Sequence, residues 1–171
     1  MAVLSGLRAA IGSNTTLDIL ELNLPLYNQD EDKSAGPDAV QAFRQAIAAS
    51  DGLVISTPEY NHGIPGVLKN ALDWASRPNG TSVLKNKPTL VISNSPAFTG
   101  GARAQYQANE TLLSVQAALV LGPQVVIGGV VNKVQDGQLI DKTSITFALA
   151  AIDRLLDLCR RLQTERERAL V

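Results

Sequence analysis

The chain has 171 residues, of which 45% are hydrophobic and 18% charged, with a formal net charge of −1. This length suits a single domain spanning residues 1–171, and the near-neutral charge gives no reason to expect nucleic acid or an anionic membrane as partner. The apolar runs are shorter than the roughly 20 residues of a membrane span, and neither a signal peptide nor a disulfide is indicated, so a cytoplasmic location is expected.

Short apolar runs alternate along the chain with longer segments of helical period. Residues 3–11 are predicted as the tail of a first helix, and the alternating residues 16–22 as a half-buried strand. The compact runs 52–57, 88–93 and 125–131 suit parallel strands buried on both faces. Helices are predicted at residues 37–50, 64–75, 102–121 and, from a cap at Thr143 or Ser144, to 162. This order predicts an α/β three-layer sandwich with a parallel sheet.

The last predicted helix contains Cys159, the only cysteine of the chain. It falls on the apolar stripe of the helix, which favours a core thiol over a nucleophile. The alternating charges of residues 160–168 indicate a solvated helix end.

Ligands of parallel α/β sheets bind at the carboxyl ends of the strands, so the loops there are the candidate sites. Residues 58–66 follow the 52–57 strand and contain two prolines and two glycines. They predict a shaped turn into a helix N-terminus, with free backbone N–H groups and with Tyr60 as a stacking surface. An ordinary strand–helix turn and a ligand site are equally good interpretations of this pattern alone.

Residues 94–103 follow the next predicted strand in the same way. The pair Gly100–Gly101 allows close backbone approach, and Phe98 is placed to lie over a ligand. An ordinary loop leading into a helix and a ligand site are again about equally good interpretations. Two such loops at one sheet edge, however, favour a planar ligand between them.

Residues 57–78 (TPEYNHGIPGVLKNALDWASRP) resemble the signature block of the NADPH-dependent FMN reductase family, which includes quinone- and chromate-reducing flavoproteins. Residues 24–30 (LPLYNQD) resemble the family's segment after its second strand, and residues 100–105 (GGARAQ) its second flavin loop. The resemblance extends from about Thr16 onward and implies a flavodoxin-like fold, bound FMN, and a homodimer or homotetramer.

The resemblance also implies roles for individual residues and a reaction. The isoalloxazine and ribityl parts of FMN would be lined by Pro58, Glu59, Tyr60 and Asn61. The far edge of the ring would be approached by Ser95, Gly100 and Gly101. NAD(P)H would give hydride to the flavin, which passes electrons to a small-molecule acceptor such as a quinone. No catalytic side chain is assigned, because the flavin performs the redox chemistry.

His62 and Glu59 each have an alternative interpretation. His62 has no cluster of cysteines or carboxylates nearby, so no metal site is expected, and a turn residue at the mouth of the flavin site is favoured over a general base. For Glu59, pairing with another subunit or with backbone is favoured over proton transfer.

One part of the family pattern is missing. The family opens with a strand and a Ser-Gly-Ser-Leu-Arg-like loop that holds the FMN phosphate, and residues 1–8 match it only faintly. Too few residues separate Arg8 from Thr16 for a crossover, which takes at least about 10–12 residues. In the strand order 2-1-3-4-5 the absent strand is interior, so its loss would leave two unpaired backbone edges.

Three explanations of the missing strand stay open. The native protein begins upstream of Met1, the remaining strands close up, or a partner chain supplies the strand. We expect this chain, expressed alone, to copurify with little FMN. The alternative function is a flavin-free, inactive scaffold or interaction protein derived from the family; an electron-carrier flavodoxin is disfavoured, because such carriers are strongly acidic.

Overall fold

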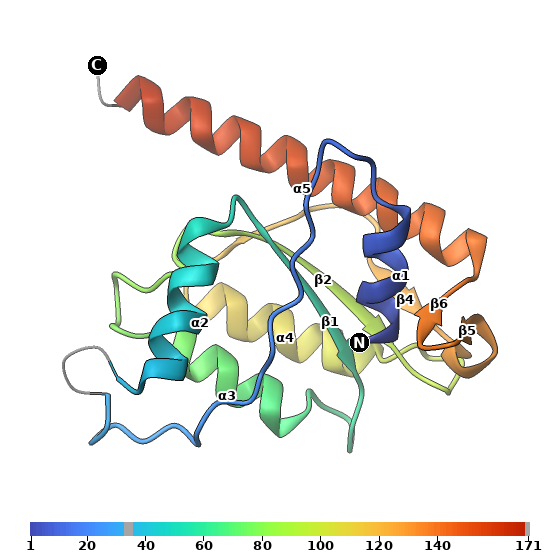
Figure 1. Cartoon of the computed structure of the whole chain (residues 1–171), viewed down its shortest axis with the longest axis horizontal. Coiled ribbons are helices and arrows are strands. Elements are labelled where there is room, and N and C mark those ends of the chain that lie inside the picture. The colour runs from blue at the N-terminus through green and yellow to red at the C-terminus, as the bar shows by residue number, and fades with distance from the viewer. Residues whose placement is uncertain (33–35, 170–171) are drawn as a thin grey trace.

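The computed structural model describes residues 1–32 and 36–169. Helices and strands are arranged around one central sheet (Figure 1). In chain order they are α1 (Ala2–Ala10), α2 (Asp38–Ala49), β1 (Leu53–Pro58), α3 (Gly66–Ala75), β2 (Pro88–Asn94), α4 (Ala102–Ser114), β3 (Ala118–Leu119), β4 (Val125–Ile127), the 3₁₀ helix η1 (Val130–Lys133), β5 (Val134–Gln135), β6 (Gln138–Leu139) and α5 (Lys142–Ala169).

The central sheet is parallel, as the sequence predicts. β1 and β2 pair along their whole length, from Leu53 opposite Thr89 to Pro58 opposite Asn94. The other edge of β2 pairs with β3 at its start and with β4 at its end. β5 and β6 form a separate antiparallel hairpin.

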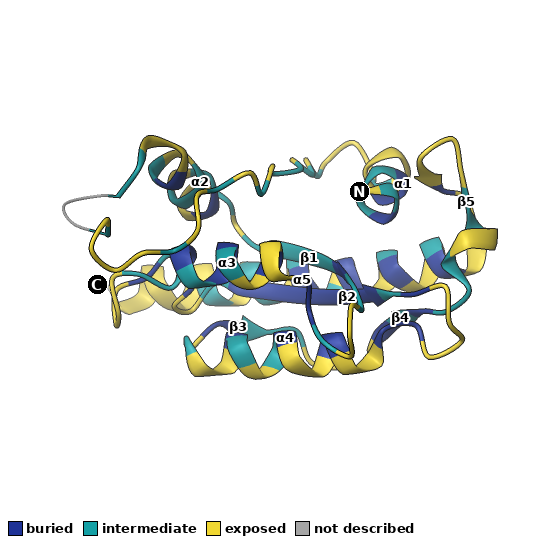
Figure 2. Ribbon diagram, turned by 90° about the horizontal axis from the view of Figure 1, so that it is seen from below, coloured by how far each residue is buried: buried dark blue, intermediate teal, exposed yellow. Residues whose placement is uncertain are grey.

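Helices cover both faces of this sheet, which makes the three-layer sandwich. Leu90 and Ile92 of β2 pack in one cluster with α1 and α5. Val91 points the other way, into a second cluster that includes α3 and α4. Successive side chains of a strand point to opposite faces, so β2 lies at the centre of the core (Figure 2).

Residues 16–22 are not the strand that the alternation predicts. They pair with no neighbour in the described part of the chain, and β1 pairs only with β2. Leu17 packs against the α1–α5 cluster, and Leu20 and Leu22 pack against the α3–α4 cluster. The alternation therefore identifies an amphipathic segment correctly, but a strand also needs a partner for its backbone. The explanation in which the remaining strands close up is wrong.

Two predicted elements are shorter than expected. α4 ends at Ser114 rather than at residue 121, because Gln116 takes a left-handed φ of 62° and the amides of Gln116 and Ala117 bond back to Leu113 and Leu112. The next residues pair with β2 as β3. The predicted strand 125–131 ends at Ile127, after which the chain turns into η1.

The cap of α5 is Asp141 rather than Thr143 or Ser144. Its carboxylate accepts a hydrogen bond from the backbone N–H of Ser144 at 2.8 Å. Hydrogen bonds from the side chain and the backbone of Ser144 hold the pKa of Asp141 below its usual value. An ionised carboxylate at a helix N-terminus also suits the helix dipole.

Cys159 is half-buried on α5 rather than fully buried, and its thiol donates to the backbone oxygen of Asp51 at 3.3 Å. Burial raises the pKa of this thiol, which disfavours a nucleophilic role. The helix end at residues 160–168 is largely exposed, as its charges predict.

None of the helices in the described residues is both long enough and apolar enough to cross a membrane.

Candidate functional site

The two loops that the sequence singles out lie together at one edge of the sheet. β1 and β2 are parallel and end in register, with Pro58 opposite Asn94. The Asn94 side-chain amide donates to the backbone oxygen of Thr57 at 3.3 Å. Residues 59–66 and 95–101 therefore leave the sheet side by side, which is the arrangement that a shared ligand requires.

The first loop is built around a tight two-residue turn. Tyr60 and Gly63 exchange two backbone hydrogen bonds, of 2.9 and 3.0 Å. Asn61 and His62 between them have left-handed φ values of 50° and 66°. Non-glycine residues adopt this conformation uncommonly, asparagine and histidine more readily than most, and such residues cluster at functional sites. The turn leaves Tyr60 63% exposed at the sheet edge.

Glu59 faces the second loop rather than solvent, and its side chain is only 11% exposed. Its Oε2 accepts a hydrogen bond from the backbone N–H of Arg103 at 3.2 Å, and its Oε1 pairs with the Arg103 guanidinium at 3.2 Å. Arg103 lies in the first turn of α4. The carboxylate of Glu59 is thus engaged with backbone and with a cation of the same chain.

In the second loop, Ser95 is buried and its polar groups are bonded within the chain. Its N–H donates to Ile127, its carbonyl accepts from Val130, and its hydroxyl oxygen accepts from Ala97. A ligand at this position would meet the surrounding loop more readily than the Ser95 hydroxyl. The exposed residue of this loop is Phe98, which is 93% exposed.

Gly100 and Gly101 are required by packing within the chain. Both are buried and have left-handed φ values, of 59° and 84°. A Cβ on Gly100 would lie 2.9 Å from the backbone nitrogen of Gly128, and one on Gly101 would lie 3.0 Å from the backbone oxygen of Asn94. The glycines therefore seat the start of α4 against β2 and β4, a reason that the sequence pattern does not disclose.

The signature block also anchors residues 24–30. The Trp74 indole N–H and the Asn70 side-chain amide both donate to the backbone oxygen of Pro25, at 2.8 and 2.9 Å. The Tyr27 ring packs edge-on against Trp74, with ring centroids 4.8 Å apart. Trp74 is fully buried, whereas Tyr27 is half-buried and Tyr60 is exposed.

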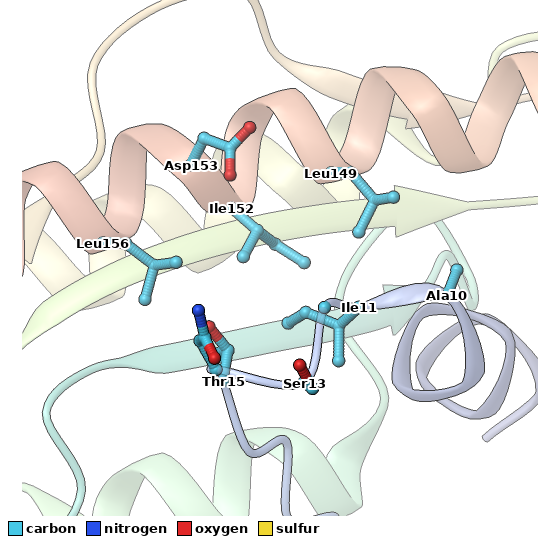
Figure 3. Close-up of a pocket in the computed structure, with 10 residues that line it drawn as sticks. Ala10, Ile11, Ser13, Thr15, Leu149, Ile152, Asp153 and Leu156 are labelled. Atoms are coloured by element: carbon cyan, nitrogen blue, oxygen red, sulfur yellow. The ribbon is translucent and has the colours of Figure 1, made fainter.

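Two cavities lie away from these loops. One of about 360 Å³ separates residues 10–15 from α5, and Figure 3 shows Ile152 and Leu156 pointing across it toward Ile11 and Thr15. The other, of about 270 Å³, lies between the end of α2 and α5. Neither has a residue of the two loops in its lining, and no group of three or more His, Cys, Asp or Glu side chains among the described residues is placed to hold a metal ion.

The fold and the paired loops define a flavodoxin-like α/β protein with its candidate site at the carboxyl edge of a parallel sheet. The family model for NADPH-dependent FMN reductase matches residues 2–132, and the chain belongs to this family.

Named relatives agree with this assignment. A quinone reductase of Pseudomonas putida is 40% identical over 144 residues, which are 83% of this chain and 77% of that protein. A 2-hydroxy-1,4-benzoquinone reductase of a Burkholderia species is 46% identical over 116 residues, 67% of this chain and 63% of that protein. Among solved structures, the flavoenzyme NAD(P)H:(acceptor) oxidoreductase FerB of Paracoccus denitrificans superposes with a TM-score of 0.80 at 32% identity, covering 92% of this chain and 87% of that one.

Proposed function

We propose that this protein is an NAD(P)H-dependent oxidoreductase that passes hydride from NAD(P)H through bound FMN to a small acceptor such as a quinone. The observation that carries the proposal is the meeting of residues 58–63 and 95–101 at one sheet edge. The family match and the quinone reductases among the relatives support the same chemistry.

The residues present fit a flat aromatic cofactor. Each loop exposes one aromatic ring, Tyr60 in the first and Phe98 in the second, and a bound ring would remove both from water. We propose that Pro58, Glu59, Tyr60 and Asn61 line the isoalloxazine and ribityl parts, and that Ser95, Gly100 and Gly101 form the backbone wall at the far edge. FMN supplies the hydride chemistry when bound, and the chain's own contribution is to place the ring and keep water away.

The proposal includes a further strand beside β1. The outer edge of β1 is unpaired in the described residues, and apolar side chains of β1 and of residues 17–22 pack on both core clusters. An open backbone edge flanked by apolar side chains favours the addition of a strand. We propose that a strand pairs there and that the loop after it holds the FMN phosphate, so that residues 1–171 form a single domain from which this strand is missing. We expect weak FMN retention by the chain without it.

We further propose that the protein is a cytoplasmic homodimer or homotetramer. Exposed apolar side chains on α3 and α4 support an interface, with Val67 51%, Tyr106 64% and Leu113 61% exposed. The single cysteine suits a reducing compartment. Light scattering coupled to size-exclusion chromatography measures the oligomeric state directly.

The test of the function is NAD(P)H oxidation by the purified chain with FMN and a benzoquinone added. We expect turnover that depends on both additions and exceeds the rate of free FMN with NAD(P)H. A rate equal to that of free FMN would favour the flavin-free scaffold instead. A variant that exchanges the stacking ring, Tyr60→Ala, should lower the rate, whereas Lys85→Ala, on an exposed loop away from the site, should not.

A further inference from the structure

The start of α4 lacks a cap of its own. Gly101 occupies the N-cap position and has no side chain to accept a hydrogen bond from the first turn. The first backbone N–H groups of a helix have no partner within the helix, and a side chain normally satisfies one of them. Here the partner is Glu59, 44 residues earlier in the sequence, whose Oε2 accepts from the backbone N–H of Arg103.

A second link joins the same two elements one turn further along. The side-chain oxygen of Gln107 in α4 accepts a hydrogen bond from the backbone N–H of Ile64 at 2.7 Å. Ile64 immediately follows the tight turn formed by residues 60–63, and Gly63 gives Gln107 the room to approach. The turn is therefore bonded to α4 on both sides. Before it, the Glu59 carboxylate binds the Arg103 N–H, and after it, the Ile64 N–H binds the Gln107 side chain.

We propose that Glu59 and Gln107 are positioning residues that fix the spacing of the two flavin loops, and that Glu59 does so by capping α4. We call the contacts of Glu59 and Gln107 with the two elements the clamp. This inference rests on the proposed function, because the ring that the clamp positions loops for is that of the same cofactor. The Glu59 carboxylate is occupied by α4, so only the backbone of this residue is free to face a ligand. It acts on the ring through the loops and is not a catalytic residue.

The cap contributes more than the ion pair in the same contact. The Arg103 side chain is 60% exposed, and exposed ion pairs contribute little because water screens them. The backbone bond places a carboxylate that is largely withdrawn from water at the positive end of the α4 dipole. Loss of the carboxylate should therefore release the turn, whereas loss of the guanidinium should not.

The test measures riboflavin binding by fluorescence quenching, because riboflavin carries the ring without the phosphate. We expect Glu59→Ala to weaken this binding roughly 5- to 30-fold, the range expected for the loss of one hydrogen bond to a charged group. Glu59→Gln and Gln107→Glu, which keep an acceptor oxygen, should retain most of the affinity. Arg103→Ala should stay within about twofold of the unsubstituted chain, as should Asp73→Asn, which breaks an exposed ion pair on α3.

Two further measurements separate positioning from a general loss of stability. Binding is measured well below the melting temperature of each variant, and the visible spectrum of bound riboflavin should shift in Glu59→Ala but not in Asp73→Asn. Hydrogen exchange of the flavin-free chain should show lost protection of the Arg103 amide in Glu59→Ala and of the Ile64 amide in Gln107→Ala.

The outcomes distinguish this inference from the proposed function. If the unsubstituted chain binds neither riboflavin nor FMN, the proposed function fails, and with it the role of the clamp in flavin binding, while amide exchange still tells whether Glu59 caps α4. If the unsubstituted chain binds riboflavin and Glu59→Ala binds it equally well, the clamp alone is overturned. If Arg103→Ala lowers the riboflavin affinity as much as Glu59→Ala does, the conclusion that the cap contributes more than the ion pair is overturned.

Discussion

β1 and β2 contain the same four residues in the same order, Leu-Val-Ile-Ser, yet the chain buries them very differently. In β2, every residue except Asn94 is buried, whereas in β1 only Thr57 is. β2 is paired on both edges, and β1 is paired on one. Burial of a strand is therefore set by its neighbours as much as by its own side chains.

The two tetrapeptides also face opposite ways. Val54 lies beside Leu90 in the sheet, and Ile55 beside Val91, so the register between the copies is offset by one residue. A shift of one residue exchanges the two faces of a strand. Ile92 accordingly packs toward α1 and α5, whereas Ile55 packs toward α3 and α4.

The largest expected difference between the two strands is in amide exchange. Amides of a parallel strand alternate between its two edges, so those of β1 that point away from β2 have no partner strand among the described residues. We expect amides of β2 to exchange at least about a thousandfold more slowly than these, because they need global opening. Equal protection along both strands, measured by NMR, would show that something covers the free edge.

Truncating the matched isoleucines tests the packing side of the comparison. Ile92 is fully buried, so Ile92→Ala should lower the free energy of unfolding by about 2–5 kcal/mol. Ile55→Ala should cost less than about half of that, since part of its side chain already meets water. Urea titrations of the two variants measure both values. A greater loss of unfolding free energy in Ile55→Ala than in Ile92→Ala would contradict the conclusion that β1, with one unpaired edge, is packed less fully than β2.

The glycines after the two strands extend the comparison to the loops. Gly100→Ala, after β2, should cost about 1–3 kcal/mol, because its φ is left-handed and the new Cβ meets β4. Gly66→Ala, at the start of α3 after β1, meets nothing within 4 Å and should stabilise the chain by about 0.4–1 kcal/mol. Thermal unfolding of both variants gives the sign of each effect. A neutral Gly100→Ala would show that the α4 start can move away from β4.

The smallest expected effect concerns α5, which packs against β2. Because the pKa of Asp141 is lowered in the folded state, its contribution to stability is present above the ordinary carboxyl pKa and is lost as the pH falls through the folded value. Asp141→Asn should lower the melting temperature slightly at neutral pH and by less at acid pH. If the difference between the variant and the unsubstituted chain does not shrink with acid, Asp141 is not the cap.

The same contrast separates the features that the sequence predicts from those that it does not. The compact apolar runs predicted the bounds of β1 and β2 to within about one residue. The glycine- and proline-rich loops predicted which edge of the sheet carries the candidate site. Both signals lie within one short segment of the sequence. The strand expected at residues 16–22 and the end of α4 were wrong, since a strand needs a neighbour that pairs with it, which the described residues do not provide at 16–22, and the end of α4 depends on the pairing of Ala118 and Leu119 with β2. The contacts of Glu59 and Gln107 with α4 join residues more than 40 positions apart, and no sequence pattern within one segment reveals them.

In the proposed function, residues 58–63 and 95–101 hold opposite parts of one flavin ring. The most direct measurement is an NMR titration of the chain with riboflavin, followed at the backbone amides. We expect the largest shifts in these two segments together, with smaller shifts in the first turn of α4. Shifts confined to the cavity between residues 10–15 and α5, or to one loop without the other, would contradict the claim.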